Sequence, residues 1–120
     1  LHLAAFSKDD SDYHLQITGE RLDGNNCVIV EIPDPRNAGS LVTRNHWKVD
    51  RAFIDSLCRS RRPSEAGTVF KEAVRVRVTG QLFYDLSHGN PASRGKKKMK
   101  AITSWEIHPV WTITLVKGSK

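Results

Sequence analysis

The sequence predicts a mainly β fold: a small five-stranded barrel with one helix between its third and fourth strands. Five segments alternate apolar and polar residues with the period of two that a strand produces. A segment between the third and fourth of them changes to helical spacing. Gly80, in the middle of the fourth, indicates the bend that a curved sheet needs. The 120 residues suffice for one core, so we expect a single domain over residues 1–120.

The first three strands are expected in the N-terminal third of the chain. Residues 1–6 look like the tail of a first strand that is truncated at its N-terminus. Residues 12–18 and 28–32 alternate in the same way and predict the second and third strands. The turn-forming DGNN within residues 19–26 separates these two.

The helix is expected to begin near His46, with Asn45 as its N-cap, and to end before Pro63. Its core-facing stripe at helical spacing consists of Val49, Ala52, Phe53 and Leu57.

The last two strands are expected at residues 74–85 and 102–116, joined by a long polar loop. In the last strand, residue 105 and every second residue after it lie on one face, and this face is rich in aromatic and β-branched side chains. We therefore expect Trp105 and Trp111 to face the core. This order of elements is typical of the OB-fold, a five-stranded Greek-key barrel. Another small barrel or an open α+β sheet is the alternative.

Four segments carry a resemblance to a group of uncharacterised bacterial domains: DYHLQIT at 12–18, VIVEIPDP at 28–35, VRVRVTGQLFYDLSHG at 74–89, and SWEIHPV at 104–110. That group carries similar DxHL, EIP, VxVTGxxxxDxxH and WEIHPV pieces in the same order. The resemblance implies a small barrel, often on exported proteins, and assigns no chemistry. It is the basis for an expected exported location.

The net charge of +6 favours an anionic partner. No apolar run is long enough for a membrane span, and we expect none. The sequence has no nucleophile elbow, P-loop or dinucleotide fingerprint.

The basic residues of the last loop and of the preceding strand, with one outward aromatic residue, predict a surface for nucleic acid or another anion. Cationic side chains track a phosphate backbone and an exposed aromatic ring stacks on bases. The predicted contact residues are Arg75, Arg77, Phe83, Arg94, Lys96, Lys97, Lys98 and Lys100. The plainer alternative is a loop that is basic for solubility alone.

A second set of residues forms a predicted polar cluster, because strand parity points most of them away from the apolar rows. Its members are His14, Glu31, Asp85, His88, Glu106 and His108. Imidazoles with carboxylates can bind a divalent metal or carry out acid–base chemistry. The alternative is a hydrogen-bonded cluster with a structural role.

Two cysteines, Cys27 and Cys58, are the only disulfide candidate, and buried free thiols are the alternative.

These observations favour a non-catalytic module that binds an anionic polymer such as single-stranded nucleic acid. An exported domain with a protein partner and a metal-dependent or acid–base site are the alternatives. We expect no cofactor, with a divalent metal as the remaining candidate.

Overall fold

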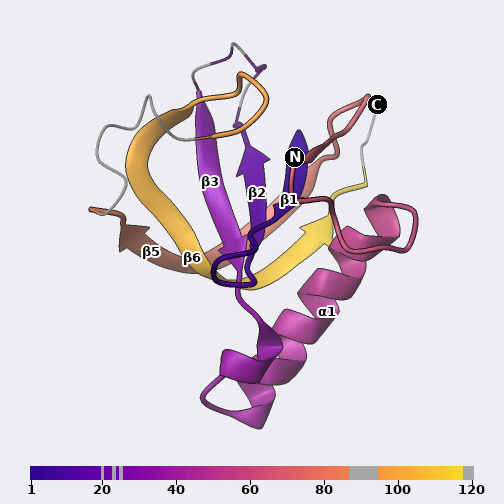
Figure 1. Ribbon diagram of the computed structural model, residues 1–120, viewed down its shortest axis with the longest axis vertical. Helices are drawn as coiled ribbons and strands as arrows, with labels where there is room; N and C mark the ends of the chain where they lie inside the picture. The colour runs from indigo at the N-terminus through magenta and orange to yellow at the C-terminus, as the bar shows by residue number, and fades with distance from the viewer. Residues whose placement is uncertain (20, 23, 25, 87–94, 118–120) are drawn as a thin grey trace.

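The computed structural model describes residues 1–19, 21, 22, 24, 26–86 and 95–117. Within them, six strands form one open mixed sheet in the order β4-β1-β2-β3-β6-β5, accompanied by one α-helix and one short 3-10 helix (Figure 1). The mainly β class is therefore confirmed. The prediction of a five-stranded closed barrel was wrong. A sixth strand lies between the predicted helix and the fourth predicted strand, and β4 and β5 are the two edges of an open sheet.

The strands pair mostly with neighbours in sequence. Their bounds are β1 Leu3–Phe6, β2 Tyr13–Ile17, β3 Cys27–Ile32, β4 Thr68–Val69, β5 Val76–Tyr84 and β6 Ala101–Leu115. β1, β2 and β3 form an antiparallel meander, β4 pairs antiparallel with β1, and β5 with β6. The pairing of β3 with β6 is parallel.

Helix α1 spans Leu41–Leu57 and follows the 3-10 helix η1 at Pro35–Asn37. It begins earlier than predicted because Ser40, and not Asn45, is the N-cap: its Oγ accepts a hydrogen bond from the Thr43 amide at 3.1 Å. Its buried face carries Trp47, Asp50 and Ile54, whereas Val49 is exposed.

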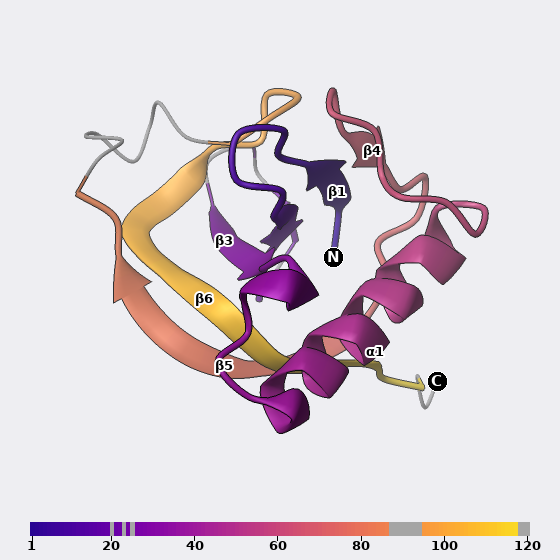
Figure 2. The same ribbon diagram turned by 60° about the horizontal axis from the view of Figure 1, so that its bottom comes forward.

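The main core lies between the concave side of the sheet and α1, which crosses below the strands (Figure 2). Tyr13 and Leu15 of β2 and Val30 of β3 enter it, as the alternation predicted. The residues between them, including His14 and Glu31, therefore lie on the opposite, outer side of the sheet.

Strand β6 bends sharply where Gly80 of β5 lies opposite Val110. A β-carbon on Gly80 would lie 2.5 Å from Ile107 Cγ2 and 2.6 Å from the Pro109 carbonyl oxygen, so only glycine allows this close approach. The β5–β6 register shifts on both sides of Gly80, which changes the face that β6 presents to the core.

The prediction that Trp105 and Trp111 face the core was wrong. Trp105 is 48% exposed and Trp111 is 43% exposed, while Val110 and Ile113 fill the core. Trp111 lies at the register shift, since Thr112 pairs with Thr79 and Val110 with Gly80. Trp105 pairs with Tyr84 at the end of the ladder, beyond the reach of the main core.

A small second core covers part of the outer side of the sheet. Leu3, Ala5, Cys27 and Met99 form it. Both cysteines are free, with Cys27 in this cluster and Cys58 at the end of α1, so the proposed disulfide is not formed. Among the described residues, no helix has the length and hydropathy to cross a membrane.

Candidate functional site

The outer side of the sheet holds a cluster of ionisable residues from three neighbouring strands. We call Asp12, His14, Glu31, Glu106 and His108 the charged cluster. Asp12 and His14 share one side of the chain at the start of β2, and Glu31 pairs opposite His14 on β3. Glu106 and His108 follow on β6, next to β3. Alternation along three adjacent strands thus brings together four of the six predicted members.

His108 lies at the centre of the charged cluster. Its Nε2 is 3.3 Å from Asp12 Oδ2, and its Nδ1 is 3.5 Å from Glu31 Oε1 and 3.7 Å from Glu106 Oε1. On the far side of Glu31, its Oε2 lies 3.2 Å from His14 Nδ1. One imidazole is therefore surrounded by three carboxylates.

The charged cluster is largely shielded from water. Asp12 and Glu106 are buried, and Glu31 and His108 are partly buried. The carboxylates of Asp12 and Glu106 raise the pKa of His108 to about 10, so that ring is cationic at neutral pH. Burial raises the pKa of Glu31, and the neighbouring His14 and His108 oppose this shift.

Gln16 connects the charged cluster to the segment that directly precedes β6. His14 Nε2 lies 2.7 Å from Gln16 Oε1, which also accepts a hydrogen bond from the Lys96 amide at 2.7 Å. Gln16 Nε2 donates to the Met99 carbonyl at 3.1 Å. Because Gln16 has no exposed surface, these bonds fix the end of the loop against β2.

We call residues 95–100 the basic turn. The Met99 amide donates to the Lys96 carbonyl at 3.0 Å, and the two central residues, Lys97 and Lys98, have φ of 55° and 66°. Positive φ at both central positions is typical of a type I′ turn, which favours Asn and Gly and costs energy for lysine. The side chain of Met99 anchors the turn in the second core, and Lys97 and Lys98 are exposed.

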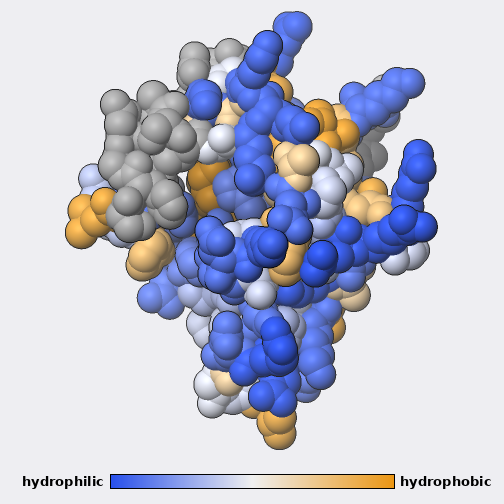
Figure 3. All heavy atoms as spheres, in the orientation of Figure 1, coloured by the Kyte–Doolittle hydropathy of each residue, from blue (hydrophilic) through white to orange (hydrophobic). Residues whose placement is uncertain are grey.

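An exposed aromatic pair lies on the ladder between β5 and β6. Tyr84 is 46% exposed, and its ring centroid lies 5.0 Å from that of Trp105 at an interplanar angle of 64°. Leu82 and Leu86, which follow the same alternation, are also exposed. Figure 3 shows hydrophobic atoms at the left flank, where β5 ends. We call Tyr84 and Trp105 the aromatic pair.

The predicted basic surface is divided by the structure. Arg75 and Arg77 lie at the start of β5, where Arg77 pairs with Thr114 near the end of β6. The basic turn precedes the start of β6, at the other end of that strand. Phe83 is exposed as predicted, but its ring lies against His108, with centroids 5.4 Å apart.

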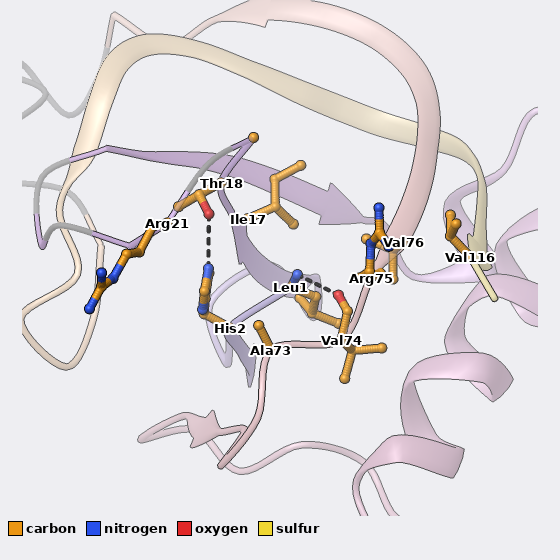
Figure 4. A pocket seen from close by; sticks show the side chains of 11 residues that line it. Leu1, His2, Ile17, Thr18, Arg21, Ala73, Val74, Arg75, Val76 and Val116 are labelled. Atoms are coloured by element: carbon orange, nitrogen blue, oxygen red, sulfur yellow. Dashed lines mark hydrogen bonds between the residues drawn. The ribbon is translucent and has the colours of Figure 1, made fainter. Parts of the chain in front are cut away.

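Arg75 instead lines a cavity of about 520 Å³ together with Arg21 and His2 (Figure 4). Within it, His2 Nε2 lies 2.9 Å from Thr18 Oγ1, and the Leu1 amine donates to the Val74 carbonyl at 2.7 Å. Most of the other residues that line the cavity are aliphatic.

One predicted site residue lies elsewhere, and two others are not described. Asp85 is buried at the end of β5, where its amide donates to the Ser104 carbonyl at 3.0 Å; the described ion pairs of His108 do not include it. His88 and Arg94 fall outside the described residues.

Sequence reasoning missed Asp12, Gln16 and the aromatic pair. Asp12 and Gln16 share the parity of His14, so alternation contained the signal for both. No sequence signal identifies the aromatic pair, because the alternation of β6 assigns Trp105 to the core.

Comparisons of the chain with known protein families, with curated proteins and with solved structures gave no match.

Proposed function

We propose that this chain is a non-catalytic binding module with an OB-like arrangement, whose ligand is single-stranded nucleic acid. The observation that carries this proposal is the aromatic pair. It is exposed on the ladder between β5 and β6, and the basic turn directly precedes β6. Ring faces stack on bases and lysines neutralise phosphates, which together hold a single strand without reading its sequence.

The strand order supports the OB-like arrangement. An antiparallel meander of three strands is followed by a strand parallel to the third, and a further strand pairs antiparallel with that one. Two hydrogen bonds between Leu1 and Val74 link β1 to the segment before β5. In OB-folds the loop before the last strand flanks the ligand. Here that loop contains the basic turn.

Distance along β6 supports joint use of the two features. Lys100 directly precedes the strand and Trp105 is its fifth residue, a span of roughly 17 Å at 3.4 Å per residue. OB-folds bind about 4–16 nucleotides, so one strand of nucleic acid is long enough to contact both.

The anchoring of the basic turn argues against a loop that is basic for solubility alone. A solvated loop needs no buried glutamine to fix its backbone and no lysines at positive φ. Here Gln16 and Met99 hold the turn, and the two strained residues are the ones that present their charges to solvent.

The test is fluorescence anisotropy of labelled single-stranded DNA and RNA at low and at physiological salt. If the four lysines of the basic turn each contact one phosphate, the logarithm of the association constant should fall with the logarithm of the salt concentration with a slope of about −3. Trp105→Ala should weaken binding by about 1–3 kcal/mol, the value of one stacked base.

Trp111→Ala is the matched control, because Trp111 is similarly exposed on the same strand but contacts His46 of α1. It should bind as the parent does. Absence of binding at low salt would contradict the proposal and favour a protein partner for the exposed apolar residues. Binding that Trp105→Ala and Trp111→Ala weaken equally would show that the aromatic pair is not the site.

A further inference from the structure

We propose that Asp12, Glu31 and His108 bind a divalent first-row transition metal ion of the Zn²⁺ type. The inference is independent of nucleic-acid binding, since the three residues lie on the outer side of the sheet and none belongs to the basic turn or the aromatic pair. It rests on the spacing of their donor atoms, on the environment of His108 and on the local charge.

The donor atoms are already spaced as ligands. One donor atom from each of the three residues lies within 4.8 Å of the other two. Nε2 of His108 lies 3.3 Å from Asp12 Oδ2, whereas Glu31 Oε1 lies 3.5 Å from the other ring nitrogen, Nδ1. Four-coordinate Zn²⁺ with bonds of about 2.1 Å places neighbouring ligand atoms about 3.4 Å apart, so Asp12 and Nε2 already have this spacing and the Glu31 carboxylate must move toward them to complete the set.

His108 also has a hydrogen-bonding capacity that the protein leaves unused. Its Nδ1 is shielded from solvent and, within the described part of the chain, has no hydrogen-bond partner of good geometry. Carboxylates stand beside both ring nitrogens. Nε2, beside Asp12, can therefore release its proton to solvent and bind the ion, while Nδ1 keeps its proton and donates to Glu106 Oε1, 3.7 Å away. A hydrogen bond from the second nitrogen commonly orients a metal-binding histidine.

The charges favour a cation. Three carboxylates surround one imidazole in a site that is mostly shielded from water. A divalent ion would bring two positive charges to these carboxylates. An imidazole with carboxylates suits Zn²⁺ and its neighbours in the transition series better than Mg²⁺ or Ca²⁺, which prefer oxygen ligands alone.

The strands hold the ligands in place. Glu31 lies on β3 and His108 on β6, which pair with each other, and Asp12 directly precedes β2. His14 contacts the second oxygen of Glu31 and limits its rotation. A site built on paired strands keeps its geometry better than one built on loops.

The experiment uses the full chain, produced without a polyhistidine tag and treated with chelator. Equilibrium dialysis against Zn²⁺, with elemental analysis, should give one ion per chain at micromolar free Zn²⁺. His108→Gln and Glu31→Gln should each lower the affinity at least tenfold. His46→Gln on α1 is the control for loss of a histidine and should bind as the parent does.

A second measurement does not depend on folding of the variants. Co²⁺ added to the parent chain should give the intense visible absorption of a four-coordinate site, and Zn²⁺ should remove it. Less than one equivalent of bound Zn²⁺ at 100 µM free metal, or equal affinity of the parent and of the folded His108→Gln and Glu31→Gln variants, would overturn the assignment.

Discussion

The two halves of β6 face different surroundings. In the second half, Val110 and Ile113 pack into the main core beside Trp47 and Ile54 of α1. In the first half, residues 101–109 contribute Glu106 and His108 to the charged cluster. The bend opposite Gly80 separates the two.

The two tryptophans of β6 illustrate this difference. Trp105 and Trp111 are nearly equally exposed, so exposure alone does not distinguish them. Trp111 lies against His46 of the helix, with ring centroids 6.5 Å apart. Trp105 instead lies against Tyr84 of β5, near the end of β6 that follows the basic turn. The second half of β6 packs against the helix, and the first half presents charged and aromatic groups.

The largest effect on stability is expected from His108→Ala in the first half. Removal of the imidazole leaves Asp12 and Glu106 buried without their cation, which should lower the free energy of unfolding by on the order of 3 kcal/mol. Urea unfolding measures this loss of stability. The control is His46→Ala, because His46 contacts Trp111 in the second half of β6. A loss no larger than that of the control would show that the charged cluster does not stabilise the fold.

The same residue gives a pH dependence. The folded pKa of about 10 lies above the ordinary value for histidine, so its stabilising contribution is complete below about pH 6.5 and is lost as the pH rises toward 10. The parent should therefore lose stability over this range more steeply than His108→Gln.

An intermediate effect is expected at the bend. Gly80→Ala places a β-carbon against Ile107 and the Pro109 backbone, so we expect a loss of about 1–3 kcal/mol in the free energy of unfolding. Gly39→Ala is the matched control, because nothing lies within 4 Å of its β-carbon. Equal unfolding midpoints for the two variants would contradict the close approach at the bend.

The smallest effect is expected in the second half, at Asp50. Its Oδ1 accepts a hydrogen bond from the Ile113 amide at 3.2 Å, and burial raises its pKa to about 6. A raised carboxyl pKa means that stability falls as the pH rises from about 4 to 6, because the ionised form is disfavoured in the folded state. Asp50→Asn should remove this fall.

Thermal unfolding between pH 4 and pH 7 measures the effect of Asp50. The control is Glu72→Gln, at an exposed position. Persistence of the parent's pH dependence in Asp50→Asn would assign it to another group.

Alternation predicted the meander well because the β1–β2 and β2–β3 ladders run in unbroken register, so one parity holds along each strand. It therefore placed His14 and Glu31 on one face. In β6 the register shifts twice beside Gly80, and one parity cannot describe both halves. Val110 consequently enters the core and Trp111 does not.

Two other features had no reliable local signal. The anchoring of the basic turn depends on Gln16, eighty residues away in sequence, which composition alone cannot connect to it. The start of α1 depends on which of two possible caps is used, and Ser40 gives a longer helix than Asn45.

The most direct test of the proposed function compares Trp105→Ala with Trp111→Ala in binding labelled single-stranded nucleic acid at low salt. We predict that the first variant loses about 1–3 kcal/mol of binding free energy and that the second loses none. Equal affinities for the parent and Trp105→Ala would contradict the assignment of the first half of β6 as the binding surface.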